Sequence, residues 1–204
     1  MPFTFMAPVG SAVASTVAGK LKVPVLYIVL LSGVLQTLGF GLLASMPTSA
    51  GIPARIYGFQ VIAGFGCGIN ISTLLLLVPF VVEARDKGKV PVYLAPTMLT
   101  ILAVGMGAIS QLRVMGGAIV LAIATSVFNS YTSPRLVGYL SQYGMTVNAI
   151  YSAQSLAKLS VVDRDEVRSI LAMGFNRQMI VLSAFAAAQI PTAALLWRKK
   201  QIVV

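Results

Sequence analysis

The sequence of 204 residues contains no histidine and only one cysteine, Cys67. Histidine is the commonest general base and a common zinc ligand, so its absence removes both roles. One cysteine forms no intramolecular disulfide. Charged residues are scarce as well, at 10% of the chain, against about 25% in soluble domains. The sequence also offers no Ser/His/Asp set, metal-ligand cluster or phosphate-binding loop. We therefore expect no enzymatic activity, no cofactor and no metal.

Hydrophobic residues, by contrast, make up 57% of the chain, and the mean hydropathy is +0.89. A helix crosses a hydrocarbon core of about 30 Å with about 20 apolar residues. Five stretches of suitable length and composition predict an all-α integral membrane protein with about five transmembrane helices. The expected spans are residues 1–19, 23–46, 56–82, 103–129 and 178–197.

The segment 136–174 has a different composition, with polar residues followed by a charged cluster. Asp163 and Glu166 have the spacing of a capping box at a helix N-terminus. Val167, Ile170 and Leu171 then lie on one face, and we expect Gly174 to end the helix. The segment is interpreted as an amphipathic connector outside the bilayer. The alternative is that residues 136–157, which carry no charge, insert as a marginal helix.

The fifteen Lys and Arg residues outnumber five Asp and Glu, for a net charge of +10. Because the basic residues form no patch with interleaved aromatics, we expect no nucleic-acid partner. They follow the first, third and last spans, which the positive-inside rule places in the cytoplasm. This orientation leaves the N-terminus outside, as expected for a piece of a longer protein. The basic residues concerned are Lys20, Lys22, Arg85, Lys87, Lys89, Arg198, Lys199 and Lys200.

Small residues recur in the apolar stretches at four-residue intervals, which lets membrane helices approach closely. The glycines assigned to helix packing are Gly10, Gly33, Gly41, Gly64, Gly68, Gly116 and Gly117. The run GFGCG at 64–68 is not a nucleotide-binding loop, because it lacks the P-loop lysine and the acidic partner of a dinucleotide site.

Polar residues inside the expected spans are the candidates for function. Gln60, Asn70, Gln111 and Arg113 are assigned to the substrate cavity. Arg113 is the strongest of these, because a charge inside a span is expected to face the bundle or a water-filled cavity. The alternatives are that the amides hydrogen-bond between helices and that Arg113 extends to the membrane interface.

Several of these runs together resemble the major facilitator superfamily. The most specific resemble the 14-span drug–proton antiporters, especially their fungal members, and cover that branch's C-terminal part. The matching runs are GSAVASTVAGKLK at 10–22, LQTLG at 35–39, YGFQVIAGFGCGIN at 57–70, VVEARD at 81–86, QLRVMGGAI at 111–119, AIATS at 122–126, FNRQM at 175–179 and FAAAQ at 185–189.

Residues 88–102 depart from the family pattern, which passes almost directly from the VVEARD loop into the span that begins at Ala103. This insert, with Pro91 and Pro96, is interpreted as an interfacial or kinked extension. We hypothesise that it is a retained intron, which sequencing of the mature transcript will decide.

The resemblance implies transport of small hydrophobic compounds by drug-efflux proton antiport. The expected partners are the bilayer, a small-molecule substrate of unknown identity and protons. Because no Asp or Glu lies within the expected spans, protons have to be carried by groups outside them. The chain alone is not expected to transport. The expected location is multi-pass in the plasma or vacuolar membrane. The alternatives are a non-transporting membrane helix-bundle partner and a small oligomeric channel.

Overall fold

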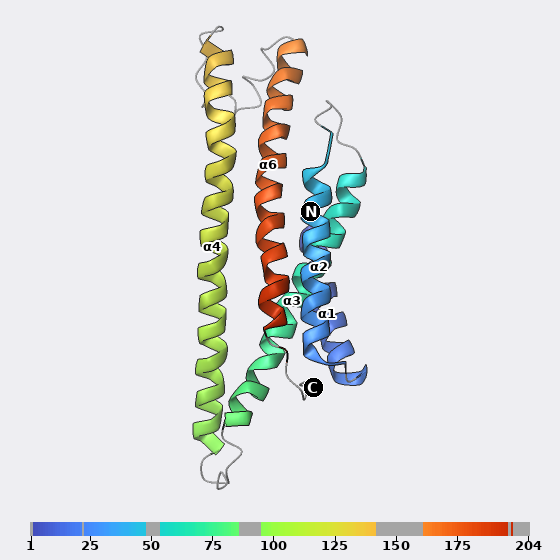
Figure 1. Ribbon diagram of the computed structural model, residues 1–204, viewed down its shortest axis with the longest axis vertical. Coiled ribbons are helices and arrows are strands. Elements are labelled where there is room, and N and C mark those ends of the chain that lie inside the picture. Colours follow the sequence, from blue (N-terminus) through green and yellow to red (C-terminus); the bar gives the residue numbers. More distant parts are fainter. Residues whose placement is uncertain are drawn as a thin grey trace.

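The computed structural model describes residues 2–21, 23–47, 54–85, 95–141, 161–195 and 197. These ranges form five α-helices and contain no strand (Figure 1). The helices are α1 (Pro2–Leu21), α2 (Val25–Ala44), α3 (Arg55–Arg85), α4 (Ala95–Ser141) and α6 (Val161–Ala194). The all-α fold predicted from the apolar stretches is therefore confirmed.

Four of the helices are long and apolar enough to cross a membrane: Val25–Ala44, Arg55–Leu77, Ala103–Tyr139 and Asp163–Ala194. The first helix, α1, is not among them. That α1 is a fifth span stays a prediction. Residues 88–94 of the insert lie outside the described ranges, whereas 95–102 form the first turns of α4.

The helices pack as a row of neighbours in the order α1, α3, α2, α6 and α4, with a smaller contact between α3 and α4. One core cluster joins the first three of these through Ala14, Ala18, Ile28 and Ile69. A second cluster joins α2 to α6 through Val25, Val29 and Ala193. Helix α2 therefore lies at the centre of the row.

Helices α1 and α3 run parallel and meet backbone to backbone. A Cβ atom added at Gly64 would collide with the carbonyl oxygen of Phe3, and one at Gly68 with that of Ala7. Gly10 faces the carbonyl of Phe65 in the same way. Since the contacts of Gly64 with Phe3 and of Gly68 with Ala7 are four residues apart on both helices, one face of α3 lies along one face of α1. Such close approach is the usual basis of helix association in lipid.

Helix α2 is held to both of its neighbours by short contacts and hydrogen bonds. A Cβ atom at Gly39 would lie 2.7 Å from the Ala63 backbone of α3. On the α6 side, the Ser183 hydroxyl donates to the Thr37 carbonyl at 3.2 Å and the Asn176 amide to the Met46 carbonyl at 2.8 Å. In a bilayer these bonds satisfy polar groups that lipid leaves unpaired.

Helices α4 and α6 form an antiparallel pair that runs beyond the end of α2 (Figure 1). A Cβ atom at Gly174 would collide with Thr132 Cγ2 of α4, and the Tyr139 hydroxyl donates to Asp163 Oδ1 at 2.6 Å. The prediction that Gly174 ends a helix is therefore wrong, because α6 continues through it to Ala194. Without a Cβ, Gly174 is needed where the two helices cross, and no left-handed turn occurs there.

The lengths of α4 and α6 bear on the predicted connector. With 47 residues, α4 is about 70 Å long at 1.5 Å per residue, more than twice the thickness of a hydrocarbon core. Parts of this helix therefore have to lie outside the core. The interpretation of 136–174 as an extramembrane connector stays a prediction, and residues 142–160 of it lie outside the described ranges.

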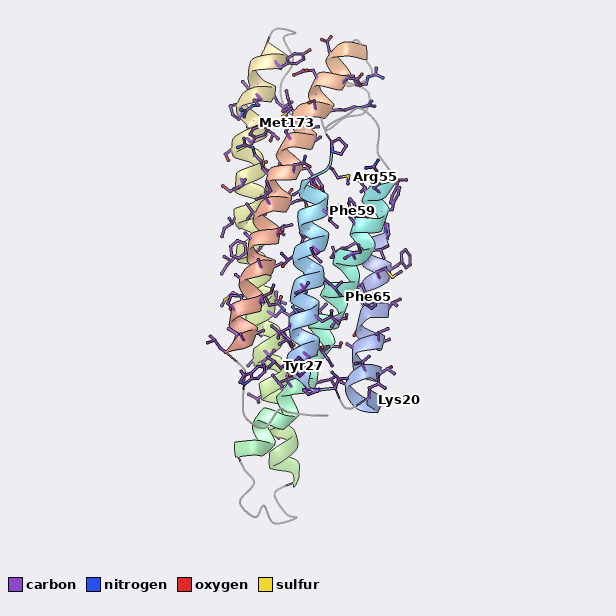
Figure 2. All side chains as sticks on the ribbon, turned by 45° about the vertical axis from the view of Figure 1, so that its right-hand side comes forward. Lys20, Tyr27, Arg55, Phe59, Phe65 and Met173 are labelled. Carbon is purple, nitrogen blue, oxygen red and sulfur yellow. The ribbon has the colours of Figure 1, made fainter. Side chains whose placement is uncertain are left out.

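The orientation of the bundle is testable by cysteine labelling, because Cys67→Ser removes the only cysteine. Lys20 and Arg55 are exposed and lie at opposite ends of the bundle (Figure 2). In that background we expect a membrane-impermeant maleimide to label Arg55→Cys on intact cells and to label Lys20→Cys only after permeabilisation. The opposite pattern would reverse the predicted orientation, and labelling of both on intact cells would mean that α2, which lies between the two positions, does not cross the membrane.

Candidate functional site

A cleft of about 690 Å³ opens between α2, α3, α4 and α6. Its walls are mostly apolar, and a small number of polar side chains converge on it, as in many small-molecule sites. The lining residues are Gln36, Phe40, Asn70, Arg113, Val114, Gly116, Gly117, Val120, Leu121, Leu182, Phe185, Ala186 and Gln189.

The polar centre of the cleft is an amide pair from two helices. Asn70 Nδ2 of α3 donates to Gln189 Oε1 of α6 at 3.3 Å. The Asn70 Oδ1 atom is buried and has no hydrogen-bond partner among the described residues. An acceptor buried in this state typically costs about 1–3 kcal/mol. A ligand that brought a donor to this atom would remove that penalty.

The remaining polar groups of the cleft differ in their burial and in their hydrogen bonding. Gln36 on α2 is buried and donates from Nε2 to the Gly66 carbonyl of α3 at 3.1 Å, so one of its two amide N–H donors is already occupied. Arg113 on α4 is exposed, and it is the only charged residue among those that line the cleft. The cleft therefore carries a net positive charge from an exposed side chain.

The structure brings together two of the four residues predicted for the cavity. Asn70 and Arg113 line the cleft, whereas Gln60 and Gln111 do not. Gln111 is exposed on another face of α4. Sequence reasoning did not select Gln36 and Gln189 for the cavity, although both lie in runs that carry the family resemblance, LQTLG and FAAAQ.

The glycines predicted for helix packing fall into three groups. Gly10, Gly64 and Gly68 lie at the α1–α3 contact, where an added Cβ would collide with backbone. Gly33 and Gly41 on α2 face α6. A Cβ atom added at Gly33 would lie 3.2 Å from Ile190, and one added at Gly41 would lie 3.5 Å from Ser183.

Gly116 and Gly117 on α4 form the third group. They have no atom within 4 Å of an added Cβ and line the cleft instead.

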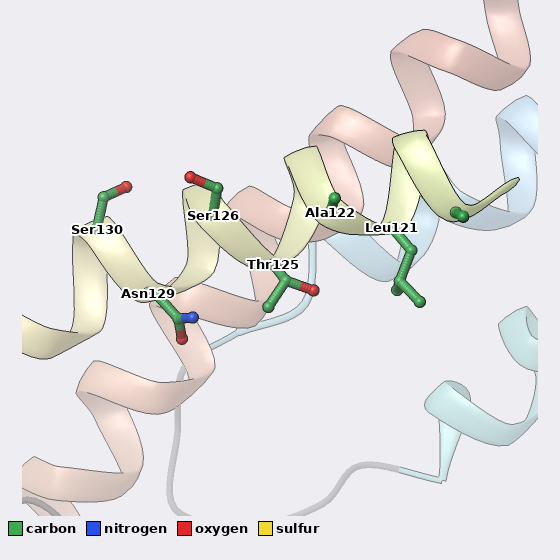
Figure 3. Close-up of a pocket in the computed structure, with 7 residues that line it drawn as sticks. Leu121, Ala122, Thr125, Ser126, Asn129 and Ser130 are labelled. Carbon is green, nitrogen blue, oxygen red and sulfur yellow. The ribbon is translucent and has the colours of Figure 1, made fainter. Parts of the chain in front are cut away.

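A second hollow, of about 700 Å³, lies along α4 alone (Figure 3). Thr125, Ser126, Asn129 and Ser130 provide its polar side chains, and Leu121 also lines the first cleft. Apart from its contacts with α6 and α3, this helix is largely uncovered within the described residues: only 6% of its most apolar 18-residue window is buried.

Comparison with known proteins decides the family. The chain is 32% identical over 196 residues to the MFS-type transporter FPY5 of Fusarium mangiferae, which covers 96% of this chain and 30% of that protein. It belongs to the MFS-type transporters. The chain is also 27% identical over 166 residues to the MFS-type transporter ppz2 of Metarhizium majus, covering 76% of this chain and 25% of that protein. A third relative, the MFS-type transporter lnaF of Aspergillus flavus, is 31% identical over 97 residues, 48% of this chain and 17% of that protein.

The predicted resemblance to major facilitator transporters is thus confirmed, and the relatives are fungal. No protein-family model matches the chain, and no solved structure is significantly similar to it. The chain spans less than a third of the length of the relatives it matches. The apolar helices and the similarity to MFS-type transporters together identify the chain as a multi-pass membrane protein of a transporter family.

Proposed function

We propose that this chain forms part of the translocation path of an exporter for small, largely apolar compounds in the plasma or vacuolar membrane. The observation that carries the proposal is the cleft, where Asn70, Gln189 and Arg113 from three helices converge within apolar walls. Transporters of this kind expose a midplane site alternately to each side by rocking two helical bundles. The cleft would supply one side of that site.

The charge of the cleft favours neutral or anionic substrates over cationic ones. Arg113 is its only charged lining residue, and the walls include Phe40, Leu182 and Phe185. The unpartnered Asn70 Oδ1 favours a substrate that also carries a hydroxyl or amide donor. We therefore propose weak organic acids and neutral compounds with one polar end as the substrate class.

A pair of xanthene dyes tests this substrate class on the purified chain in detergent. Fluorescein is anionic and rhodamine 6G is cationic, so a difference in their binding reports charge selectivity. We expect fluorescence polarisation to show tighter binding of fluorescein. Arg113→Gln should weaken that binding by about fivefold, the effect of losing about 1 kcal/mol from an exposed charge pair. Tighter binding of rhodamine 6G would contradict the proposed class.

The amide pair has a matched control in the same chain. We expect Gln189→Leu to weaken fluorescein binding by about fivefold. The substitution removes the amide with which Gln189 would hydrogen-bond the dye, a net contribution of about 1 kcal/mol. Gln111→Leu makes the same chemical change on α4 outside the cleft-lining set and should leave binding unchanged. Equal loss in both variants would mean that the dye binds elsewhere.

Export itself is testable in yeast cells that lack their own multidrug exporters. Transport is expected from a chimera in which this chain replaces the matching segment of the transporter from Fusarium mangiferae, and not from the chain alone. Proton antiport predicts that a protonophore stops export of preloaded fluorescein. Export that continues with the proton gradient collapsed would exclude antiport. Failure of the chimera alongside a working parent protein would contradict the proposed function.

A further inference from the structure

Two arginine side chains contact the same tyrosine ring where α4 and α6 lie side by side. The guanidinium carbon of Arg135 lies 3.8 Å from the centroid of the Tyr131 ring, and that of Arg177 lies 4.2 Å from it. The two positive charges are therefore no further apart than the sum of these distances. The Tyr131 hydroxyl donates to the sulfur of Met173 at 3.1 Å, which fixes the orientation of the ring.

Neither arginine is neutralised within the described part of the chain. The ion pair found there joins Arg168 to Asp165 at 3.4 Å. Arg135 donates to the backbone carbonyl of Tyr131 at 3.0 Å, and Arg177 stacks on the ring. Both guanidinium groups are exposed. Cation–π stacking holds both guanidinium groups in place. It provides no anion to accept hydrogen bonds from their N–H groups or to offset the repulsion between their two positive charges.

The cluster lies at the level where the apolar bundle ends. Asn176, next to Arg177, donates to the carbonyl of Met46 at 2.8 Å, just past the end of α2 at Ala44. Met173 lies at the same end of the molecule as Arg55, the first residue of α3 (Figure 2). Tyrosine is enriched at this depth, in the zone where lipid headgroups begin.

A hollow of about 330 Å³ adjoins the cluster, with both apolar and polar walls. It is lined by Tyr131, Arg135, Gly138, Tyr139, Glu166, Ile170 and Met173. Glu166 is the one acidic group in this lining, and it lies on α6 about three turns before Arg177. Ile170 and Met173 offer apolar surface to the glycerol and first methylenes of a lipid.

We propose that Arg135, Arg177 and Tyr131 form a binding site for the phosphate of an anionic phospholipid headgroup. Guanidinium groups bind phosphate oxygens through paired N–H donors, and the ring holds both guanidiniums ready to do so. A lipid bound here would also brace the α4–α6 pair where it leaves the bundle. The site shares no residue with the cleft, so it stands independently of the proposed transport.

Native mass spectrometry of the purified chain in detergent tests the site. The chain is mixed with equal amounts of dioleoylphosphatidylserine and dioleoylphosphatidylcholine, and the bound fractions are compared. We expect phosphatidylserine to be preferred by at least about fivefold, and Arg177→Gln to lower that preference by about fivefold, the effect of losing about 1 kcal/mol from an exposed charge pair. Arg135→Gln should act in the same direction.

The control is Arg168→Gln, which removes another exposed arginine of α6 that is already paired with Asp165. It should leave the lipid preference unchanged, whereas Tyr131→Leu should lower it without changing the charge. Equal loss in Arg168→Gln would show binding by net charge and overturn the proposal. So would displacement of the lipid by millimolar inorganic phosphate, which would mark a site for free phosphate. Circular dichroism and gel filtration confirm that each variant is folded.

Discussion

Gly68→Val is expected to detach α1 from α3. A Cβ at this position would collide with the backbone carbonyl of Ala7, and a backbone cannot move aside as a flexible side chain can. The helices therefore have to separate along the whole face that includes Gly64 and Gly10. Overpacking typically costs about 1–3 kcal/mol, and we expect a loss at or above the upper end. Thermal unfolding in detergent, followed by circular dichroism, measures it.

The control for this substitution lies on the same helix. Gly58 is exposed, and no atom lies within 4 Å of an added Cβ there. Gly58→Val therefore introduces the same β-branched side chain into α3 without a collision, and should change stability little. If the two variants unfolded at the same temperature, the close α1–α3 contact would not contribute to stability.

Gly174→Leu is expected to separate α4 from α6. Besides Thr132, an added Cβ would lie 3.1 Å from the ring of Phe128, so a larger side chain has nowhere to go between the helices. We again expect a loss of about 3 kcal/mol or more. Spin labels on Ser133→Cys and Phe175→Cys in a Cys67→Ser background should report a longer distance between the helices.

Gly107→Leu is the matched change on α4, because no atom lies within 4 Å of its added Cβ. It should leave both the unfolding temperature and the spin-label distance unchanged. An unchanged distance in Gly174→Leu would mean that α4 and α6 are held together elsewhere, for example by the Tyr139–Asp163 hydrogen bond. The Tyr139→Phe variant would then show the larger effect.

Much of the fold was predictable because a bilayer allows few solutions. An apolar run near 20 residues long has to satisfy its backbone internally, and a helix does this within one segment. The predicted stretches therefore became helices. Helix ends were less predictable. Glycine is a common residue at the end of a helix, but Gly174 lies inside α6 and packs against Thr132 and Phe128, which are far away in sequence.

The cleft was predicted only in part, because helical phase decides which side chains share a cavity. Gln111 and Arg113 are two residues apart, or about 200° around the helix axis, so they point in nearly opposite directions. Gln60 lies about 15 Å along α3 from Asn70. Gln189 joins the site because its side chain meets that of Asn70 from α3, a fact that depends on tertiary packing and leaves no periodic signal.

The same principle applies to glycines. The four-residue spacing selected Gly64 and Gly68, which do lie at a close helix contact. It did not select Gly39 or Gly66, whose added Cβ atoms would lie 2.7 Å from Ala63 and 2.9 Å from Leu35. Spacing identifies a ridge that permits close approach, whereas the approach itself depends on which helix arrives opposite.

Because α2 lies at the centre of the row, its two faces acquire their partner helices at different stages of synthesis. Its contacts with α3 can form as soon as residue 85 has left the exit tunnel, and α1 can dock on α3 at the same stage. Its other face waits for α6, which begins only at Val161. Until then Gly33, Thr37 and Gly41 face lipid or a chaperone, and the contacts between α2 and α6 are not yet formed.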